Sequence, residues 1–215
     1  VPHGSSRTSR TACSPAGRPC VMVDFTRPEG VLERIQTALS SGLYQVVGTT
    51  GFSQSDLAAV REWCRQYRRG AIIAPNFAVG AVVMMKLATL AARHFASVEI
   101  VELHHDRKLD APSGTAIKTA QLMAAVRKPA PAAGEEKVPG ARGGEVEGIR
   151  VHSVRLPGLV AHQEVIFGNP GEVLTIRHDS LNRESFMPGV LMAIRRVVSL
   201  QDLLYGIEAL LFPEG

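Results

Sequence analysis

Two adjacent histidines and a nearby lysine form the most reactive combination in this chain. His104 and His105 follow an expected strand at 98–103, and Lys108 comes shortly after them. Adjacent side chains at the end of a strand point in different directions, so one histidine can donate a proton while the other holds a substrate. Lys108 adds a positive charge that can bind a carboxylate or stabilise developing negative charge.

Ser113, Gly114 and Thr115 directly precede an expected helix at 117–126. The first N–H groups of a helix have no partner within it, so they can bind a carboxylate or phosphate. Taken with the histidines and the lysine, this favours a site for a small dianionic molecule. The alternative is an ordinary helix cap beside structural histidines. A metal site is disfavoured, because the histidines lack an evident third and fourth ligand.

The elements before this motif alternate between strands and helices. Expected strands at 21–23, 45–47 and 71–74 are joined by helices, which predicts a parallel α/β sheet. We expect Thr26 and Glu29 to form a capping box for the first helix, and Ser53 and Asp56 to start the second. Ligands bind beyond the carboxyl ends of such strands. A flat cofactor could bind there, although ordinary turn chemistry explains the same residues. The strand ends are Asp24–Thr26, Gly48–Gly51 and Ala74–Phe77.

The elements after residue 78 predict a second architecture. A long helix at 79–95 is expected to bury Val82, Val83, Leu87, Leu90 and Ala91. Three strand-like runs with short connections predict an antiparallel or mixed sheet, and a Pro-, Gly- and charge-rich loop precedes them. The chain is expected to end in helix that returns to the first sheet. Its apolar positions are Leu203, Leu204, Ile207, Leu210 and Leu211. The strand-like runs are 150–155, 161–167 and 173–178, and the loop is 127–148.

Composition excludes several classes of protein. The chain has 215 residues, a net charge of +4 and no apolar run of the ~18 residues that a membrane span needs. Neither membrane nor nucleic acid is an expected partner. The chain has only three cysteines, and a disulfide framework needs a larger, even number. A reducing compartment is therefore favoured. Residues 1–19 have a Ser-, Arg- and Gly-rich composition that is typical of a transit peptide or of a cloning or gene-fragment artefact, and the artefact is favoured.

The central motif resembles one family closely. Residues 102–116 match the signature of the 4-hydroxy-tetrahydrodipicolinate (dihydrodipicolinate) reductases, with the sequence ELHHDRKLDAPSGTA. Further segments resemble the same family in the expected order over about residues 21–211. They are VMVDFTRPEG, VVGTTGF, APNFAVG, RGGEVEGIRVHSVRLPGLVAHQEVIFG and NRESFMPGV. The amino-acid sequence of these segments is most similar to the sequences of the cyanobacterial and plastid branch.

The resemblance implies a role for each matching residue. His104 would be the proton donor and Lys108 the second catalytic residue, while the role of Arg183 stays open. The implied substrate contacts are His105, Ser113, Gly114 and Thr115. The implied cofactor contacts are Gly48, Thr49, Thr50, Ala74, Pro75, Asn76 and Phe77. The resemblance also implies NADH or NADPH as cofactor, a small dicarboxylate substrate, no metal, a homotetramer and a cytoplasmic location, with the plastid stroma as alternative.

The resemblance implies an incomplete Rossmann-like parallel domain at 21–77 and an α+β substrate and tetramerisation domain with a mixed sheet at 78–187. Residues 1–20 would be unstructured or non-native, and 188–215 would return to the first domain. No G-x-x-G-x-x-G phosphate-binding turn stands at 1–20. We therefore expect this chain alone to be a poor catalyst or none, and we favour an incomplete gene sequence.

The expected reaction is the reduction of 4-hydroxy-tetrahydrodipicolinate to tetrahydrodipicolinate by NADH or NADPH. One alternative is a non-catalytic assembly or substrate-binding fragment that lacks a working cofactor site. Another is a reductase of a different small dicarboxylate.

Overall fold

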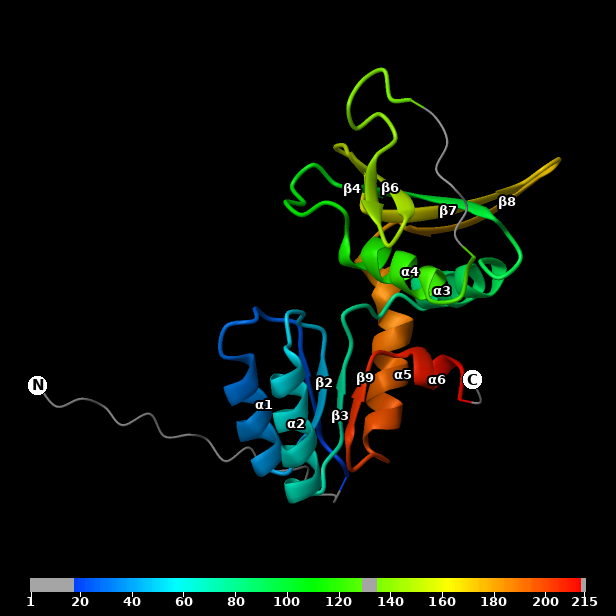
Figure 1. The fold of residues 1–215 in the computed structure, drawn as a ribbon. Helices are drawn as coiled ribbons and strands as arrows, with labels where there is room; N and C mark the ends of the chain where they lie inside the picture. Colours follow the sequence, from blue (N-terminus) through cyan, green and yellow to red (C-terminus); the bar gives the residue numbers. More distant parts are fainter. Residues whose placement is uncertain (1–17, 129–134, 214–215) are drawn as a thin grey trace, which may run out of the picture. The chain divides into compact units, whose positions relative to one another are not determined.

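The computed structural model describes residues 18–128 and 135–213, so most of the expected N-terminal segment 1–20 lies outside the described residues. The chain forms two compact units (Figure 1). Unit 1 contains residues 1–77 together with 189–215, and unit 2 contains residues 78–188. The expected combination of a parallel α/β sheet with a separate mixed sheet is confirmed.

The sheet of unit 1 has four parallel strands, the last of which comes from the C-terminal segment. The expectation of helix at Leu203 and Leu204 is wrong, because both residues pair with β3. Short apolar runs do not distinguish a strand from a buried helix by periodicity, and here pairing along β3 decides the conformation. In spatial order the strands are β1 (Val21–Asp24), β2 (Tyr44–Val47), β3 (Ala71–Ile73) and β9 (Leu203–Tyr205).

Helices cover both faces of this sheet (Figure 1). The helices α1 (Val31–Ser40) and α2 (Gln54–Tyr67) lie on one side, and α5 (Met187–Val197) lies on the other. A short helix, α6 (Glu208–Leu211), follows β9. The core between α1, α2 and the sheet is formed by apolar side chains that are at most 8% exposed. They include Ile35, Leu39, Val47, Val60, Cys64 and Ile73.

The expected starts of the first two helices have different outcomes. At α2 the expected start is confirmed, and it is a capping box: Ser53 accepts a hydrogen bond from the Asp56 N–H, and Asp56 accepts one from the Ser53 N–H. At α1 the expectation is wrong, since the helix begins after Gly30, with φ of 70° and no side-chain cap. Thr26 instead donates its N–H and hydroxyl to the buried Asp24 carboxylate, at 2.8 and 2.6 Å. This buried charge requires donors, which Thr26 and Arg34 supply.

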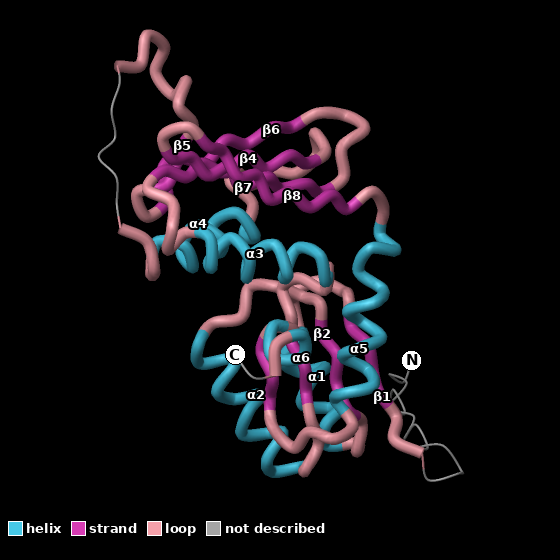
Figure 2. The backbone as a smooth tube through the Cα atoms, turned by 90° about the vertical axis from the view of Figure 1, so that its right-hand side faces the viewer, coloured by secondary structure: helices cyan, strands magenta, loops and turns pink. Residues whose placement is uncertain are grey.

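Unit 2 is a five-stranded mixed sheet with two helices on one face (Figures 1 and 2). Only the central pair β4–β6 is parallel. The helices are α3 (Val79–Ala91) and α4 (Gly114–Ala124), and a 3-10 turn η1 (Arg183–Phe186) precedes α5. β5 arises within the expected loop 127–148, of which 129–134 lie outside the described residues. In spatial order the strands are β5 (Gly144–Val146), β6 (Ile149–Arg155), β4 (Ser97–His104), β7 (Ala161–Asn169) and β8 (Glu172–Ser180).

The buried side of α3 differs from the expected one. Leu87 and Leu90 are 47% and 56% exposed, so their assignment to the core is wrong. The buried stripe consists largely of smaller or more flexible side chains, which permit close approach to α4 and the sheet. These residues are Ala81, Val82, Met84, Met85 and Ala88.

Candidate active site

The predicted proton donor His104 lies against a buried glutamate. Glu102 and His104 are two residues apart in β4, so they share the face that packs against α4. His104 Nδ1 is 2.6 Å from Glu102 Oε2, and the glutamate side chain is 0% exposed. An ionised carboxylate can only accept, so Nδ1 must donate. Among the described residues no hydrogen bond is recorded at His104 Nε2, and the ring is 15% exposed.

Arg155 keeps the Glu102 carboxylate charged. It stands beside His104 in the β4–β6 register and contacts both carboxylate oxygens, with Nη1 2.9 Å from Oε2 and Nη2 2.7 Å from Oε1. Burial alone would raise the pKa of Glu102. The hydrogen bonds from His104 and Arg155 outweigh burial and hold this pKa at about 2. Glu102 is therefore a permanent buried anion at neutral pH.

The loop after β4 is tied to the same network. Arg155 Nη2 also donates to the backbone carbonyl oxygen of Asp110 at 2.8 Å. Lys108, the second predicted catalytic residue, binds both carboxylate oxygens of Asp110 at 2.7 and 2.8 Å. The Lys108 side chain is 22% exposed and that of Asp110 is 64% exposed. A substrate carboxylate at Lys108 would therefore compete with Asp110 for the ammonium group.

The N-terminus of α4 also meets this network. The Ser113 hydroxyl accepts the Ala116 N–H at 3.2 Å and caps the helix. The Ser113 N–H donates to Glu102 Oε1 at 3.2 Å, so the expectation that this group is free for a ligand is wrong. At Gly114, which opens α4, an added Cβ would meet no atom within 4 Å. Open space therefore adjoins the helix terminus at Gly114, where the anion was expected.

His105, a predicted substrate contact, has an unusual environment. Its Nδ1 atom is buried, and among the described residues it has no hydrogen-bond partner. A buried polar atom without a partner costs ~1–3 kcal/mol, so such atoms call for an explanation. A polar group of a bound substrate would remove this cost.

Unit 1 brings the three predicted loop segments to one edge of its sheet. The Gly48 N–H donates to the Asp24 carbonyl oxygen at 2.8 Å, and the Ala74 N–H donates to the Val47 carbonyl oxygen at 2.9 Å. The Thr49 hydroxyl donates to the Thr26 carbonyl oxygen at 3.1 Å. These bonds connect the ends of β1, β2 and β3 into a continuous edge.

Aromatic rings explain why this edge needs glycine. The Phe25 ring packs over Gly48, where an added Cβ would come within 2.1 Å of the ring. Phe25 also contacts Phe77, with ring centroids 5.5 Å apart. Phe25 is 51% exposed, whereas Phe77 is buried. Of the predicted cofactor contacts, Thr50 and Pro75 are exposed, Gly48 and Asn76 are half-buried, and Thr49, Ala74 and Phe77 are buried.

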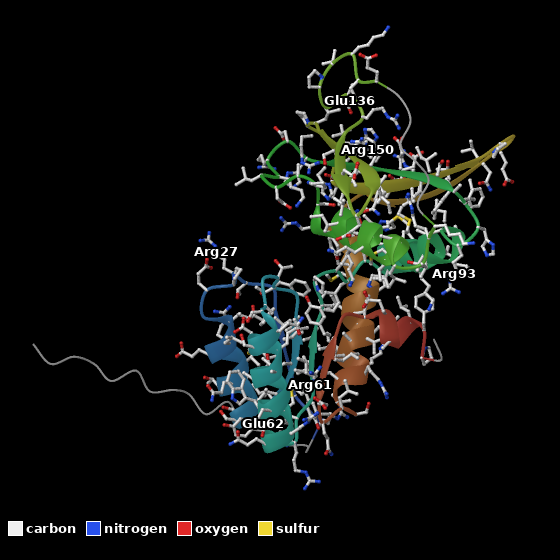
Figure 3. The ribbon with its side chains drawn as sticks, in the orientation of Figure 1. Arg27, Arg61, Glu62, Arg93, Glu136 and Arg150 are labelled. Carbon is white, nitrogen blue, oxygen red and sulfur yellow. The ribbon has the colours of Figure 1, made fainter. Side chains whose placement is uncertain are left out.

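A pocket of about 360 Å³ adjoins the end of β2. Arg27, in the loop between β1 and α1, is exposed (Figure 3). Small residues, hydroxyl groups and the half-exposed Phe25 ring fit a flat nicotinamide. The sequence contains no G-x-x-G-x-x-G turn that would bind the pyrophosphate. The pocket lining includes Pro28, Gly30, Val31, Thr50, Gly51 and Phe52.

Two features are missing from the described part of the chain. No group of three or more His, Cys, Asp and Glu side chains is placed to hold a metal ion. No helix there has the length and apolarity that crossing a membrane requires.

Comparison with known proteins identifies the family. Residues 6–77 match the family described as "Dihydrodipicolinate reductase, N-terminus", and residues 80–211 match "Dihydrodipicolinate reductase, C-terminus". This chain belongs to the dihydrodipicolinate reductase family. The 4-hydroxy-tetrahydrodipicolinate reductase of Streptococcus pneumoniae is 57% identical over 194 residues, covering 89% of this chain and 76% of the relative. That of Desulfitobacterium hafniense is 53% identical over 191 residues, covering 87% and 72%.

A solved structure agrees with this assignment. The dipicolinate-bound dihydrodipicolinate reductase of Paenisporosarcina sp. TG-14 superposes with a TM-score of 0.79 at 50% identity, covering 88% of this chain and 73% of that chain. The family predicted from the sequence is confirmed, and so is the reductase function at the level of the family. The family uses NADH or NADPH, and its N-terminal part binds the nucleotide. The match extends upstream to residue 6, further than the expected limit of residue 21.

The sequence alone assigned no role to two central residues of this candidate site, Glu102 and Arg155. A signal for Glu102 was present, because it follows Val98 and Ile100 at every second position on the buried face of β4. A charge at such a position must have partners. Arg155 had no comparable signal, since its place beside His104 depends on the β4–β6 register.

The Lys108–Asp110 pair leads to a first prediction. Asp110→Asn should tighten the binding of 2,6-pyridinedicarboxylate up to about fivefold, because an exposed ion pair that competes with the ligand is worth ~0.2–1 kcal/mol. Isothermal titration calorimetry measures this change. Asp106→Asn removes the same charge from an exposed neighbour and should have a smaller effect. Weaker binding to Asp110→Asn would mean that Asp110 orients Lys108 for the ligand.

Proposed function

We propose that this chain reduces 4-hydroxy-tetrahydrodipicolinate to tetrahydrodipicolinate, with NADH or NADPH as the hydride source. The observation that carries the proposal is the buried Glu102–His104 pair beside an open helix terminus at Gly114. The names of the similar reductases and the dipicolinate in the related structure support a small cyclic dicarboxylate as the ligand.

The proposed chemistry divides into parts for named residues. The nicotinamide cofactor, when bound, supplies the hydride that replaces the substrate hydroxyl, which leaves as water with one proton. His104 supplies that proton from Nε2, while Nδ1 stays bound to Glu102. Lys108 balances the negative charge of the substrate. The α4 terminus at Gly114 and Thr115 binds one carboxylate, and His105 Nδ1 gains a polar partner.

The unit 1 edge formed by Gly48–Thr50 and Ala74–Phe77 is proposed to hold the nicotinamide. We also propose a homotetramer, in line with the exposed Val173 and Leu174 of the edge strand β8. Analytical ultracentrifugation measures that state.

The activity assay is the oxidation of NADH or NADPH in the presence of freshly formed substrate. Substrate-dependent oxidation supports the proposal. Binding of 2,6-pyridinedicarboxylate without any oxidation would instead support a substrate-binding protein without a working cofactor site. An absence of both binding and oxidation would contradict the proposed function.

Gly114→Ala tests the carboxylate site without disturbing the fold. The added methyl group enters open space, and alanine is a better helix former, so the melting temperature should not fall. The same methyl group would obstruct a carboxylate at the helix terminus, and we expect the Kd for 2,6-pyridinedicarboxylate to rise at least about tenfold, or ~1.4 kcal/mol. Gly168→Ala, at another glycine with no atom within 4 Å of an added Cβ, is the matched control. Equal affinities in both variants would place the ligand elsewhere.

A further inference from the structure

We infer that Glu102 is a positioning residue that holds His104 in the protonation form needed for proton donation through Nε2, and that Arg155 supports it by binding the same carboxylate. The inference deepens the proposed function and rests on it for the role of His104. Glu102 itself faces no substrate, because its side chain is 0% exposed.

The geometry fixes which ring nitrogen of His104 carries a permanent proton. The 2.6 Å contact with an ionised carboxylate requires Nδ1 to donate. In the neutral ring Nε2 is then the acceptor, and in the charged ring it carries the proton that is not bound to Glu102. Without Glu102 the two neutral forms would exchange, and the imidazolium would lose its nearest negative charge.

Glu102 also aligns the other parts of the site. One carboxylate binds three elements: the His104 ring at the end of β4, Arg155 at the end of β6 and the Ser113 N–H at the start of α4. Arg155 extends this connection to the backbone of Asp110 in the intervening loop. The proton donor and the helix terminus are thus both bound to the Glu102 carboxylate. A small error in their alignment lowers the reaction rate strongly.

A second glutamate of β4 provides a matched control. Glu99 also binds one histidine and one arginine, with Oε2 2.8 Å from His152 Nε2 and an ion pair to Arg142. It is three residues from Glu102 and lies on the opposite face of the strand. Glu99 is 35% exposed and Glu102 is 0% exposed, so the two positions are compared by kcat and not by stability. Positioning of the proton donor predicts a loss of kcat at Glu102 alone.

The test is a double-mutant cycle between Glu102→Gln and His104→Gln. Glu102→Gln should lower kcat at least about tenfold, and by no more than the ~10²–10⁴-fold that the general acid contributes. In the His104→Gln background it should lower kcat by less than about twofold, because residues that act as a unit are not additive. Glu99→Gln should leave kcat within about twofold of the unchanged protein. Additive losses, or an equal loss in Glu99→Gln, would overturn the inference.

A second measurement does not depend on turnover. The ring-nitrogen NMR shifts of His104 should show Nδ1 protonated in the unchanged protein and a mixture of forms in Glu102→Gln. The single variant Glu102→Gln leaves the Arg155 guanidinium buried without its partner. The double variant Glu102→Gln with Arg155→Met removes both charges, so no unpaired buried charge remains. An unchanged His104 signal in both would refute the positioning role. If NMR shows the expected change but no variant has activity, the proposed function fails and the inference about His104 stands only as a structural one.

Discussion

His104→Gln is expected to lower kcat by about 10²–10⁴-fold, since glutamine keeps a polar side chain of similar reach but cannot donate a proton as an acid. The binding of 2,6-pyridinedicarboxylate should change little, because the inferred carboxylate contacts are at the α4 terminus and Lys108. Steady-state kinetics and calorimetry on the same preparation separate the two effects.

The matched control for His104 is another histidine in a carboxylate pair. His162 Nδ1 is 2.6 Å from Asp179 Oδ1, and its Nε2 accepts the Val160 N–H at 3.2 Å, so both ring nitrogens have partners. His162→Gln should leave kcat within about threefold of the unchanged protein, an effect below ~1 kcal/mol. An unchanged kcat in His104→Gln would remove His104 from the catalytic role and leave Lys108 as the candidate donor.

Arg155→Met should destabilise the fold by about 3–5 kcal/mol at pH 7, because it leaves the Glu102 anion buried without its bidentate partner. Arg177→Met is the surface comparison. Arg177 binds Glu164 and Asp179 while 48% exposed, so its removal should cost much less than that of Arg155. Urea unfolding followed by circular dichroism measures both. A loss below about 1 kcal/mol in Arg155→Met would show that the pair contributes little to stability.

The effect of Arg155→Met should depend on pH in a defined direction. In the unchanged protein the pKa of Glu102 is lowered from 4.5 to about 2. Its stabilisation is therefore complete above about pH 4.5 and is lost as the pH falls toward 2. Without Arg155, burial raises the pKa of Glu102, so the variant regains stability when the carboxyl group is protonated. The difference in unfolding free energy between the two proteins should be largest at neutral pH and shrink below about pH 4.

The sequence by itself determined the class of each sheet and the motif that carries the chemistry. Alternation of strands and helices before residue 78 predicted a parallel sheet, and consecutive strands after residue 149 predicted an antiparallel or mixed one, which the parallel β4–β6 pair makes mixed. These predictions hold because hydrophobic periodicity and short connections restrict how neighbouring elements can pair. The family also followed from the sequence, since the stretch 102–116 combines reactive residue types in a fixed order.

Only the tertiary structure decided the partners of buried charges and the conformation of short segments. Thr26 donates to the Asp24 carboxylate and does not cap α1. Leu203 lies in a strand because it pairs with the edge of β3. Arg155 reaches Glu102 although 53 residues separate them in sequence. The physical reason is common to all three: a buried charge or a strand edge must be satisfied by whatever the fold brings near, and local sequence does not encode that neighbour.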